Sequence, residues 1–449
     1  MTDKQPTKLD FNRVMPLFVL VFVDVLSLTL ILPLLHLYGA AFGATPFQIG
    51  LIAAAFPLAQ LIGVPMMGAL SDRFGRKPLL LISQITTCIS FIMLGFANSL
   101  EMVILSRVVD GLFGANIATA QAALSDITDE SNRAQGLGLT GAAFGLGFIF
   151  GPILSLVALE AGNSLAVPAF SAALYSLLSI GLTWFGFQET LPPKQRGQGE
   201  MTRFNPFLIR RYLTNRNVNI LLILMFAQQL IFFGFESLLG LFLMCRLGLL
   251  GQGSAGVFLV VGIVLVTVQA RFIGRWSQRY GERKLVLGAL ALMAIGLTLF
   301  AMTPEQPHFF YVRELTAFDI AQQAPSTTEA ILGDFDLLLP DETNRGWWGV
   351  IWVLIVVIPL TIGAGLIRPA LNSMMTKLVS TQEYGSILGV SASFVSAANA
   401  TAPLIGGYLF QQYGASAPFF IGGGLMAVLF VLSVIIIPVQ SVARNSSPA

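Results

Sequence analysis

Apolar segments long enough to cross a bilayer recur along the whole chain, and they constrain the fold more than any other feature. A helix needs about 20 apolar residues to span the hydrocarbon core, and in lipid a backbone must satisfy its own hydrogen bonds. The sequence therefore predicts an all-α integral membrane protein with about twelve transmembrane helices. The predicted spans are 14–36, 47–70, 78–97, 100–125, 135–159, 166–187, 218–245, 253–277, 284–302, 347–368, 384–410 and 415–438.

The composition agrees with a lipid environment. Only 11% of the residues are charged, whereas a soluble domain carries about 25%. A chain with so few charged residues could not cover its surface in water. The formal net charge of +2 provides no basic field for nucleic acid. We therefore expect the lipid bilayer as a partner and no nucleic acid.

Lysine and arginine are distributed unevenly between the connections. They gather at both ends of the chain, in the central segment and in alternate connections, whereas the other connections carry only Arg246, Arg313 and Arg345. The cytoplasmic loops of membrane proteins hold the excess of positive charge. This pattern predicts a multi-pass protein of the plasma (inner) membrane with both termini in the cytoplasm.

The second half of the sequence repeats the first. GALSDRFGRK at Gly68 corresponds to GRWSQRYGERK at Gly274. The number of residues that separates matching positions is larger for later matches, so the second half contains an insertion between the earlier and the later matches. We predict two pseudo-symmetric six-helix halves, 1–187 and 218–449, joined by a cytoplasmic linker at 188–217. An outer loop insertion at about 303–346 lies in the second half. Paired repeats of this kind are typical of secondary transporters, with substrate sites near the membrane midplane.

The motif GALSDRFGRK resembles the cytoplasmic signature of the major facilitator superfamily, in the loop that joins helices two and three. Its residues are Gly68, Asp72, Arg73, Gly75, Arg76 and Lys77. The resemblance implies that Asp72 faces the start of helix eleven near Tyr384, and that Arg73 or Arg76 pairs with Asp126 at the end of helix four. These contacts would close the cytoplasmic side. The alternative for Asp72 is a structural one, in which it caps the third helix or pairs with a neighbouring arginine.

Two more stretches resemble motifs of one branch of that superfamily. LSRVVDGLFGANIATAQAALSDITD is similar to the fourth-helix motif of proton-coupled carriers, with Arg107 at its arginine and Asp110 in place of the usual glutamine. GAAFGLGFIFGPILS is similar to the fifth-helix motif of antiporters, in which Gly147, Gly151 and Pro152 match. Together they imply a twelve-span drug:proton antiporter of the tetracycline-efflux type. The tetracycline carriers have an acid in helices three and nine, and the corresponding spans here have none, which disfavours tetracycline as the substrate.

Ionisable residues inside spans are costly and therefore mark candidate functional sites. Asp24 lies near the middle of the first span and Glu236 in the seventh, and we expect both to bind protons; a structural hydrogen bond is the alternative for Asp24. Arg107 and Asp110 share a helix face, where they either neutralise each other or take part in proton coupling. Three further residues are predicted to line a substrate cavity: Arg368, Asn372 and Gln228.

These features predict a secondary active transporter that exports small lipophilic compounds in exchange for protons, by alternating access. The alternatives are proton-linked uptake of a nutrient, and a non-transporting membrane sensor or scaffold. The sequence has no H-E-x-x-H, G-x-S-x-G or Walker-type motif and only two histidines, so we expect no enzyme activity, no cofactor and no metal. We expect a monomer whose partners are a small-molecule substrate and protons.

Overall fold

Twelve membrane-spanning helices make up the fold. The computed structural model describes residues 11–128, 133–162, 164–192, 196, 212, 214–322, 339–380 and 383–436. In these residues every regular element is a helix, and twelve helices are long and apolar enough to cross a membrane. The prediction of an all-α integral membrane protein is confirmed. The two ends of the chain, most of the predicted linker and the middle of the predicted insertion lie outside the described residues.

The first half contains six spans. The first span has three segments, α1 (Phe11–Ile31), η1 (Leu32–Leu34) and α2 (Leu35–Ala40). The next spans are α3 (Pro46–Phe74) and α4 (Arg76–Gly95). The fourth span is divided into α5 (Leu100–Phe113) and α6 (Asn116–Ile127), and α7 (Arg133–Gly162) and α8 (Ala166–Gly186) complete the half.

The second half also contains six spans. Its first span is α10 (Arg216–Leu247), and its second is made of α11 (Gly251–Thr267), the π-helical turn η3 (Val268–Phe272) and α12 (Ile273–Tyr280). The remaining spans are α13 (Glu282–Ala301), α16 (Trp348–Thr376), α17 (Tyr384–Tyr413) and α18 (Ala417–Ile436). Between α13 and α16 the insertion contributes α14 (Arg313–Gln322) and the short η4 (Glu342–Asn344).

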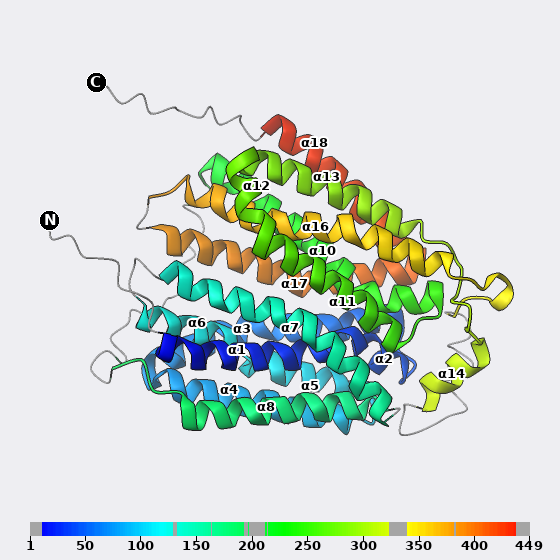
Figure 1. Cartoon of the computed structure of the whole chain (residues 1–449), viewed down its shortest axis with the longest axis horizontal. Helices are drawn as coiled ribbons and strands as arrows, with labels where there is room; N and C mark the ends of the chain where they lie inside the picture. The colour runs from blue at the N-terminus through cyan, green and yellow to red at the C-terminus, as the bar shows by residue number, and fades with distance from the viewer. Residues whose placement is uncertain are drawn as a thin grey trace.

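The two halves lie side by side, with α1–α8 below and α10–α18 above in Figure 1. The same turn joins the second and third spans of each half. Gly75 has φ +109° and Gly281 has φ +77°, and their N–H groups donate to the carbonyls of Ser71 and Ser277, both at 3.0 Å. A positive φ is readily accessible to glycine, so the motif's second glycine sets this turn in both halves.

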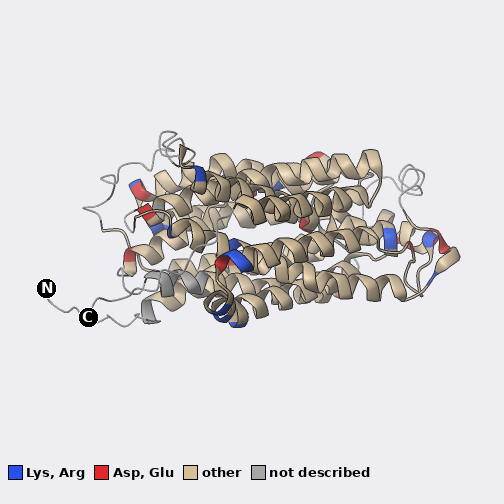
Figure 2. Cartoon of the chain, turned by 90° about the horizontal axis from the view of Figure 1, so that it is seen from above, with Lys and Arg blue, Asp and Glu red and all other residues tan. Residues whose placement is uncertain are grey.

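Charged residues gather at the two ends of the bundle, as Figure 2 shows, and few lie between them. We call the end near Gly75 and Gly281 the terminus side, because α1 begins and α18 ends there. The opposite end, which carries α14, is the loop side. Exposed apolar side chains such as Phe185 (89%) and Ile435 (74%) cover the outer surface of the helices, as expected for a surface that faces lipid.

The halves meet mainly through α3 with α17 and through α7 with α11. On the loop side this seam is tight: a Cβ added to Gly407 would lie 2.8 Å from the carbonyl oxygen of Pro46, and one on Gly262 would lie 2.9 Å from the carbonyl carbon of Phe148. On the terminus side, four glycines of the same four spans are open. A Cβ on any of them would find no atom within 4 Å: Gly68, Gly141, Gly274 and Gly389.

The halves therefore touch on the loop side and separate toward the terminus side. Figure 1 shows the same divergence, since α11 reaches α7 and α2 on the right whereas α12 lies far from the first half at the upper left. The structure represents a conformation that is closed on the loop side.

Candidate functional site

Asp24 lies on α1 in the middle of the membrane-spanning bundle and is half-buried. Its Oδ1 accepts a hydrogen bond from the Nδ2 of Asn116, at 2.6 Å. Asn116 is buried (3% exposed) and is the first residue of α6. The other end of its amide, Oδ1, has no hydrogen-bond partner among the described residues. The predicted proton-binding acid thus contacts a buried amide on the fourth span.

The fourth span is interrupted beside this contact. α5 ends at Phe113, and Gly114 and Ala115 leave the helical path before α6 begins. The N–H of Gly114 donates to the carbonyl of Asp110 at 2.6 Å. Side chains of other helices bind the carbonyls freed by the break: Ser83 Oγ donates to Phe113 O (2.5 Å) and Gln60 Nε2 to Gly114 O (3.4 Å). In membrane carriers, irregular backbone at this depth is tolerated only where it is buried in protein or lines a cavity.

Arg107 and Asp110 form a buried ion pair one turn before the break. The distance from Arg107 Nη1 to Asp110 Oδ2 is 3.6 Å, and the two side chains are 3% and 4% exposed. Thr87 Oγ1 donates to Asp110 (2.9 Å), Arg107 donates to Ser90 Oγ (3.1 Å), and the guanidinium lies 5.2 Å from the ring of Phe91. In this conformation the two charges are therefore paired within a network of side chains from α4 and α5.

The fifth-helix glycines pack α7 against α1 next to Asp24. A Cβ on Gly147 would lie 2.5 Å from a methyl carbon of Val25, and one on Gly151 would lie 2.7 Å from the Cβ of Thr29. The hydroxyl of Thr29 also donates to the carbonyl of Gly147, at 2.8 Å. Pro152 is buried within α7. This motif therefore fixes the position of α1 within the first half.

Glu236 lies on α10 in the second half and is half-buried. Its carboxylate has no hydrogen bond or ion pair to any residue that the structure describes. Gln228, predicted to line a cavity, is instead 2% exposed and donates to the carbonyl of Met225 in its own helix (3.1 Å). It does not line an open space in this conformation. The next amide, Gln229, is half-buried and donates to Asn399 of α17, at 2.8 Å.

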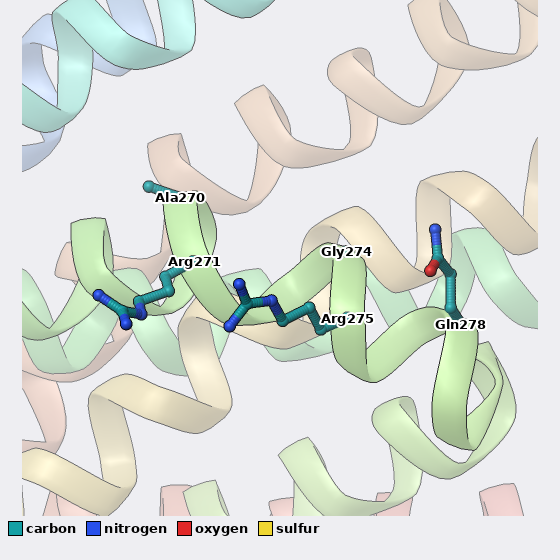
Figure 3. A pocket seen from close by; sticks show the side chains of 5 residues that line it. All are labelled: Ala270, Arg271, Gly274, Arg275 and Gln278. Atoms are coloured by element: carbon teal, nitrogen blue, oxygen red, sulfur yellow. The ribbon is translucent and has the colours of Figure 1, made fainter.

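Arg368 and Asn372 lie one turn apart on α16. Arg368 is exposed and has no acidic partner in the described part of the chain, whereas Asn372 accepts a hydrogen bond from Ser391 at 3.2 Å. A hollow of about 580 Å³ lies beside η3 at the terminus side. Figure 3 shows that its two arginines, Arg271 and Arg275, come from the same helical stretch.

A cluster of charges surrounds the first motif at the terminus side. Arg76 contacts Asp72 (2.5 Å) and Asp126 (3.0 Å), and its side chain is 10% exposed. It also donates to Ser71 Oγ, at 3.2 Å. Of the two arginines expected near Asp126, Arg76 makes the contact, while Arg73 is exposed and stacks on Phe74.

The contact implied between Asp72 and the start of α17 is not made in this conformation among the described residues. Asp72 pairs with Arg76 in its own half, and Tyr384 is exposed (39%). Gly68 is open, as described above. The first turn of α4 is capped by a residue that the sequence did not indicate: Glu189 accepts hydrogen bonds from the N–H groups of Arg76 (2.9 Å) and Lys77 (3.2 Å).

The second half has an ion pair at the corresponding place, with the charges exchanged. Glu282 is the first residue of α13, as Arg76 is of α4, and it pairs with Lys377 just after α16 at 2.5 Å. Ser373 also donates to Glu282, at 3.1 Å. This pair was not predicted, because the acid and the base occupy reversed positions in the repeat.

On the loop side, each of the three arginines is paired with an acid. Arg246 pairs with Glu305, Arg313 with Asp341 (3.3 Å), and Arg345 with Glu342. The backbone N–H of Arg313 donates to Glu342 (2.6 Å) and, together with the charge of Arg345, lowers the pKa of that carboxyl below its usual 4.5. The described loop residues are therefore tied together by ion pairs.

The two halves also touch through a histidine on the loop side. His36 of α2 is buried (4% exposed) and packs against Gly240 of α10, where a Cβ would collide with the imidazole ring. Its Nε2 has no partner among the described residues. The described residues contain no cluster of histidine, cysteine and acidic side chains that could hold a metal ion.

Comparison of the sequence with known protein families identifies the class of protein. Residues 17–319 and 340–448 match the model of the Major Facilitator Superfamily. The chain belongs to this superfamily. Its members are transporters, so the chain is a multi-pass membrane transporter of small molecules and not an enzyme.

Curated relatives narrow the comparison. The chain is 28% identical to the tetracycline resistance protein, class B, of Escherichia coli, over 86% of each chain. It is 24% identical to multidrug resistance protein 2 of Bacillus subtilis, over 91% of each chain. These relatives are consistent with the drug:proton antiporter branch of the superfamily.

Solved structures show the same fold. The human organic anion transporter MFSD10 (TETRAN) superposes with a TM-score of 0.64 at 21% identity, covering 95% of this chain and 100% of that one. The nucleoside transporter NupG superposes with a TM-score of 0.69 at 14% identity, covering 96% and 100%.

Proposed function

We propose that this transporter is a proton-coupled antiporter that exports small lipophilic compounds by alternating access. The observation that carries the proposal is an acid within each half's first span, Asp24 on α1 and Glu236 on α10. Both side chains are half-buried, and neither has a cationic partner among the described residues. Such an acid can gain and lose a proton as the site opens to each side.

The arrangement of the halves supports alternating access. The seam is closed on the loop side and its glycines are open on the terminus side, so rocking of one half against the other would exchange the open end. We propose that the terminus side faces the cytoplasm of the plasma (inner) membrane, because lysine and arginine gather there. In this orientation the structure is open toward the cytoplasm, where an exporter would collect its substrate. We propose that a single chain is the working unit, since the seam joins two halves of the same chain.

The remaining site residues have proposed roles. Arg107 and Asp110 would take part in proton coupling within the fourth span, and Arg368 and Asn372 would contact substrate on the open side. The ion pairs of Asp72, Arg76 and Asp126 would hold the terminus-side turn, with Gly68, Arg73, Gly75 and Lys77 as its other parts.

The test is proton movement in proteoliposomes that contain a trapped pH dye and an acidic lumen. A panel of lipophilic cations, tetracyclines and neutral drugs is added outside. Antiport predicts that the lumen becomes more alkaline when a substrate is added, and that Asp24→Asn and Glu236→Gln abolish this response. Asp319→Asn, which removes an exposed acid of α14, is the matched control and should behave like the wild type. If the lumen instead becomes more acidic with the substrate, the protein is an uptake carrier and the proposal is wrong.

A further inference from the structure

We propose that Asn116 is a positioning residue that detects the protonation state of Asp24 and transmits it to the break in the fourth span. This inference rests on the proposed function, because it assumes that Asp24 exchanges a proton during transport. It goes beyond that function by naming the residue through which proton exchange at Asp24 changes the conformation of the fourth span.

The first step is the chemistry of the contact. An ionised carboxylate only accepts hydrogen bonds, whereas a protonated one also donates. In the structure the Nδ2 of Asn116 donates to Asp24 at 2.6 Å, which is the arrangement that an ionised carboxylate requires. The Oδ1 of the same amide is buried and has no partner in the described part of the chain.

The second step is what a proton on Asp24 would change. Its new O–H group needs an acceptor, and the unpaired Oδ1 of Asn116 belongs to the amide already in contact with it. Turning the amide over would bring Oδ1 to the protonated carboxyl. A buried polar atom without a partner is costly, so the protonated and ionised forms of Asp24 favour different orientations of Asn116.

The third step is the connection to the backbone. Asn116 is the first residue of α6, and only Gly114 and Ala115 separate it from α5. On the other side of the break, the carbonyl of Asp110 accepts the N–H of Gly114. A change in how Asn116 is held by α1 therefore acts at the joint between α5 and α6, where Gly114 and Ala115 depart from helical backbone geometry.

Among the described residues, no charged side chain forms an ion pair or hydrogen bond with Asp24. α1 packs against α6, α7 and α8, and the charged or titratable residues of those helices lie away from its middle or carry no charge. They are Asp126 in the last turn of α6, Arg133 and Glu160 at the two ends of α7, and Tyr175 on α8. The nearest charged pair, Arg107 with Asp110, is closed on itself. The N-terminus of α6 adds a partial positive charge that favours the ionised form of Asp24.

The test measures the separation of the halves as a function of pH, without any substrate. Spin labels are attached at Phe185→Cys on α8 and Ile435→Cys on α18, two exposed positions at the terminus side, with Cys88 and Cys245 replaced by alanine. Distances are measured in nanodiscs between pH 5 and 9 in the wild type, Asp24→Asn and Asn116→Leu. Gln84→Leu is the matched control, because Gln84 is also a buried amide with an unpaired oxygen, but it binds Ser179 rather than an acid.

We expect a pH-dependent change of distance in the wild type and in Gln84→Leu. Asn116→Leu should shift the balance of the two conformations by about tenfold or more, the effect of losing one hydrogen bond to a charged group, and should flatten its pH dependence. Asn116→Ser, whose hydroxyl is too short to reach Asp24, should do the same if the leucine variant fails to fold.

The failures are distinguishable. If Asn116→Leu and Asn116→Ser follow the wild-type pH curve, or if Gln84→Leu loses the response equally, the role of Asn116 is overturned while the antiport proposal stands. If the wild type shows no response to pH and moves no protons in the dye assay, the antiport proposal fails and the role of Asn116 fails with it.

Discussion

The tight loop-side seam makes a quantitative prediction for Gly407→Ala. A Cβ at this position would lie 2.8 Å from the carbonyl oxygen of Pro46 and 3.2 Å from the Cα atoms of Phe47 and Gly50. All three neighbours are backbone atoms of α3, so no side chain can turn aside. Ordinary contact begins at 3.4 Å, and the two helices would therefore have to separate by about 0.6 Å.

The cost follows from this geometry. Overpacking a close contact costs about 1–3 kcal/mol. Alanine also favours helix over glycine by about 1 kcal/mol, but α17 is expected to be helical in both conformations, so this gain cancels between them. The penalty falls on the conformation that is closed at the loop side. The balance should shift toward the opposite conformation by roughly fivefold to a hundredfold.

The assay is the distance between spin labels at Asn98→Cys and Gln412→Cys, two exposed loop-side positions. Gly407→Ala should increase the population with a longer distance. Gly256→Ala on α11 is the control, since a Cβ there would find no atom within 4 Å. If Gly407→Ala leaves the distances unchanged, or if Gly256→Ala shifts them equally, the reasoning about the seam is refuted.

Three further predictions concern the charged ends of the bundle. Arg76→Ala removes the cationic partner of Asp72 and Asp126 and should destabilise the protein by about 1–3 kcal/mol, measured as a lower unfolding temperature in detergent; an unchanged temperature would contradict this. Glu282→Gln keeps its polar contacts but loses its charge pair with the half-exposed Lys377, so it should cost less than about 1 kcal/mol in the same assay. Because the N–H of Arg313 lowers the pKa of Glu342, the stabilisation by this carboxylate should be present above pH 4.5 and be lost as the pH falls below it. Proteolysis of the loop across this range should show the loss in the wild type and not in Glu342→Gln, and identical pH curves would refute it.

The architecture was predictable because it depends on hydropathy. Three features can be recognised directly in the sequence: spans of about 20 apolar residues, alternating positive connections, and two copies of one motif. The helices extend beyond the predicted spans on the terminus side, for example α3 to Phe74 and α16 to Thr376. The bilayer limits the apolar segment, but a helix continues into the polar region until a turn such as Gly75 ends it.

The details of the site were less predictable because they depend on tertiary contacts. No proline marks the break at Gly114, and the residues that stabilise it, Ser83 and Gln60, come from other helices. In the sequence, Asn116 is only one of several polar residues within spans, and nothing there connects it to Asp24. Glu189 caps α4 although more than a hundred residues separate them, and a pattern in one sequence gives no sign of such a contact. Gln228 and Gln229 are neighbours in the chain, yet helix geometry points them to different surroundings.

The glycine-to-carbonyl contacts of the seam have a mechanical consequence. Where Gly407 meets Pro46 and Gly262 meets Phe148, backbone faces backbone. Parting these surfaces requires no change of rotamer. Resistance to motion then comes from the other contacts of the seam, such as the N–H of Phe47 that donates to Gln411 Oε1, and from the lipids that have to rearrange around a body whose width changes differently at its two ends. The thickness and lateral pressure of the surrounding bilayer thereby become direct determinants of which end of the protein is open.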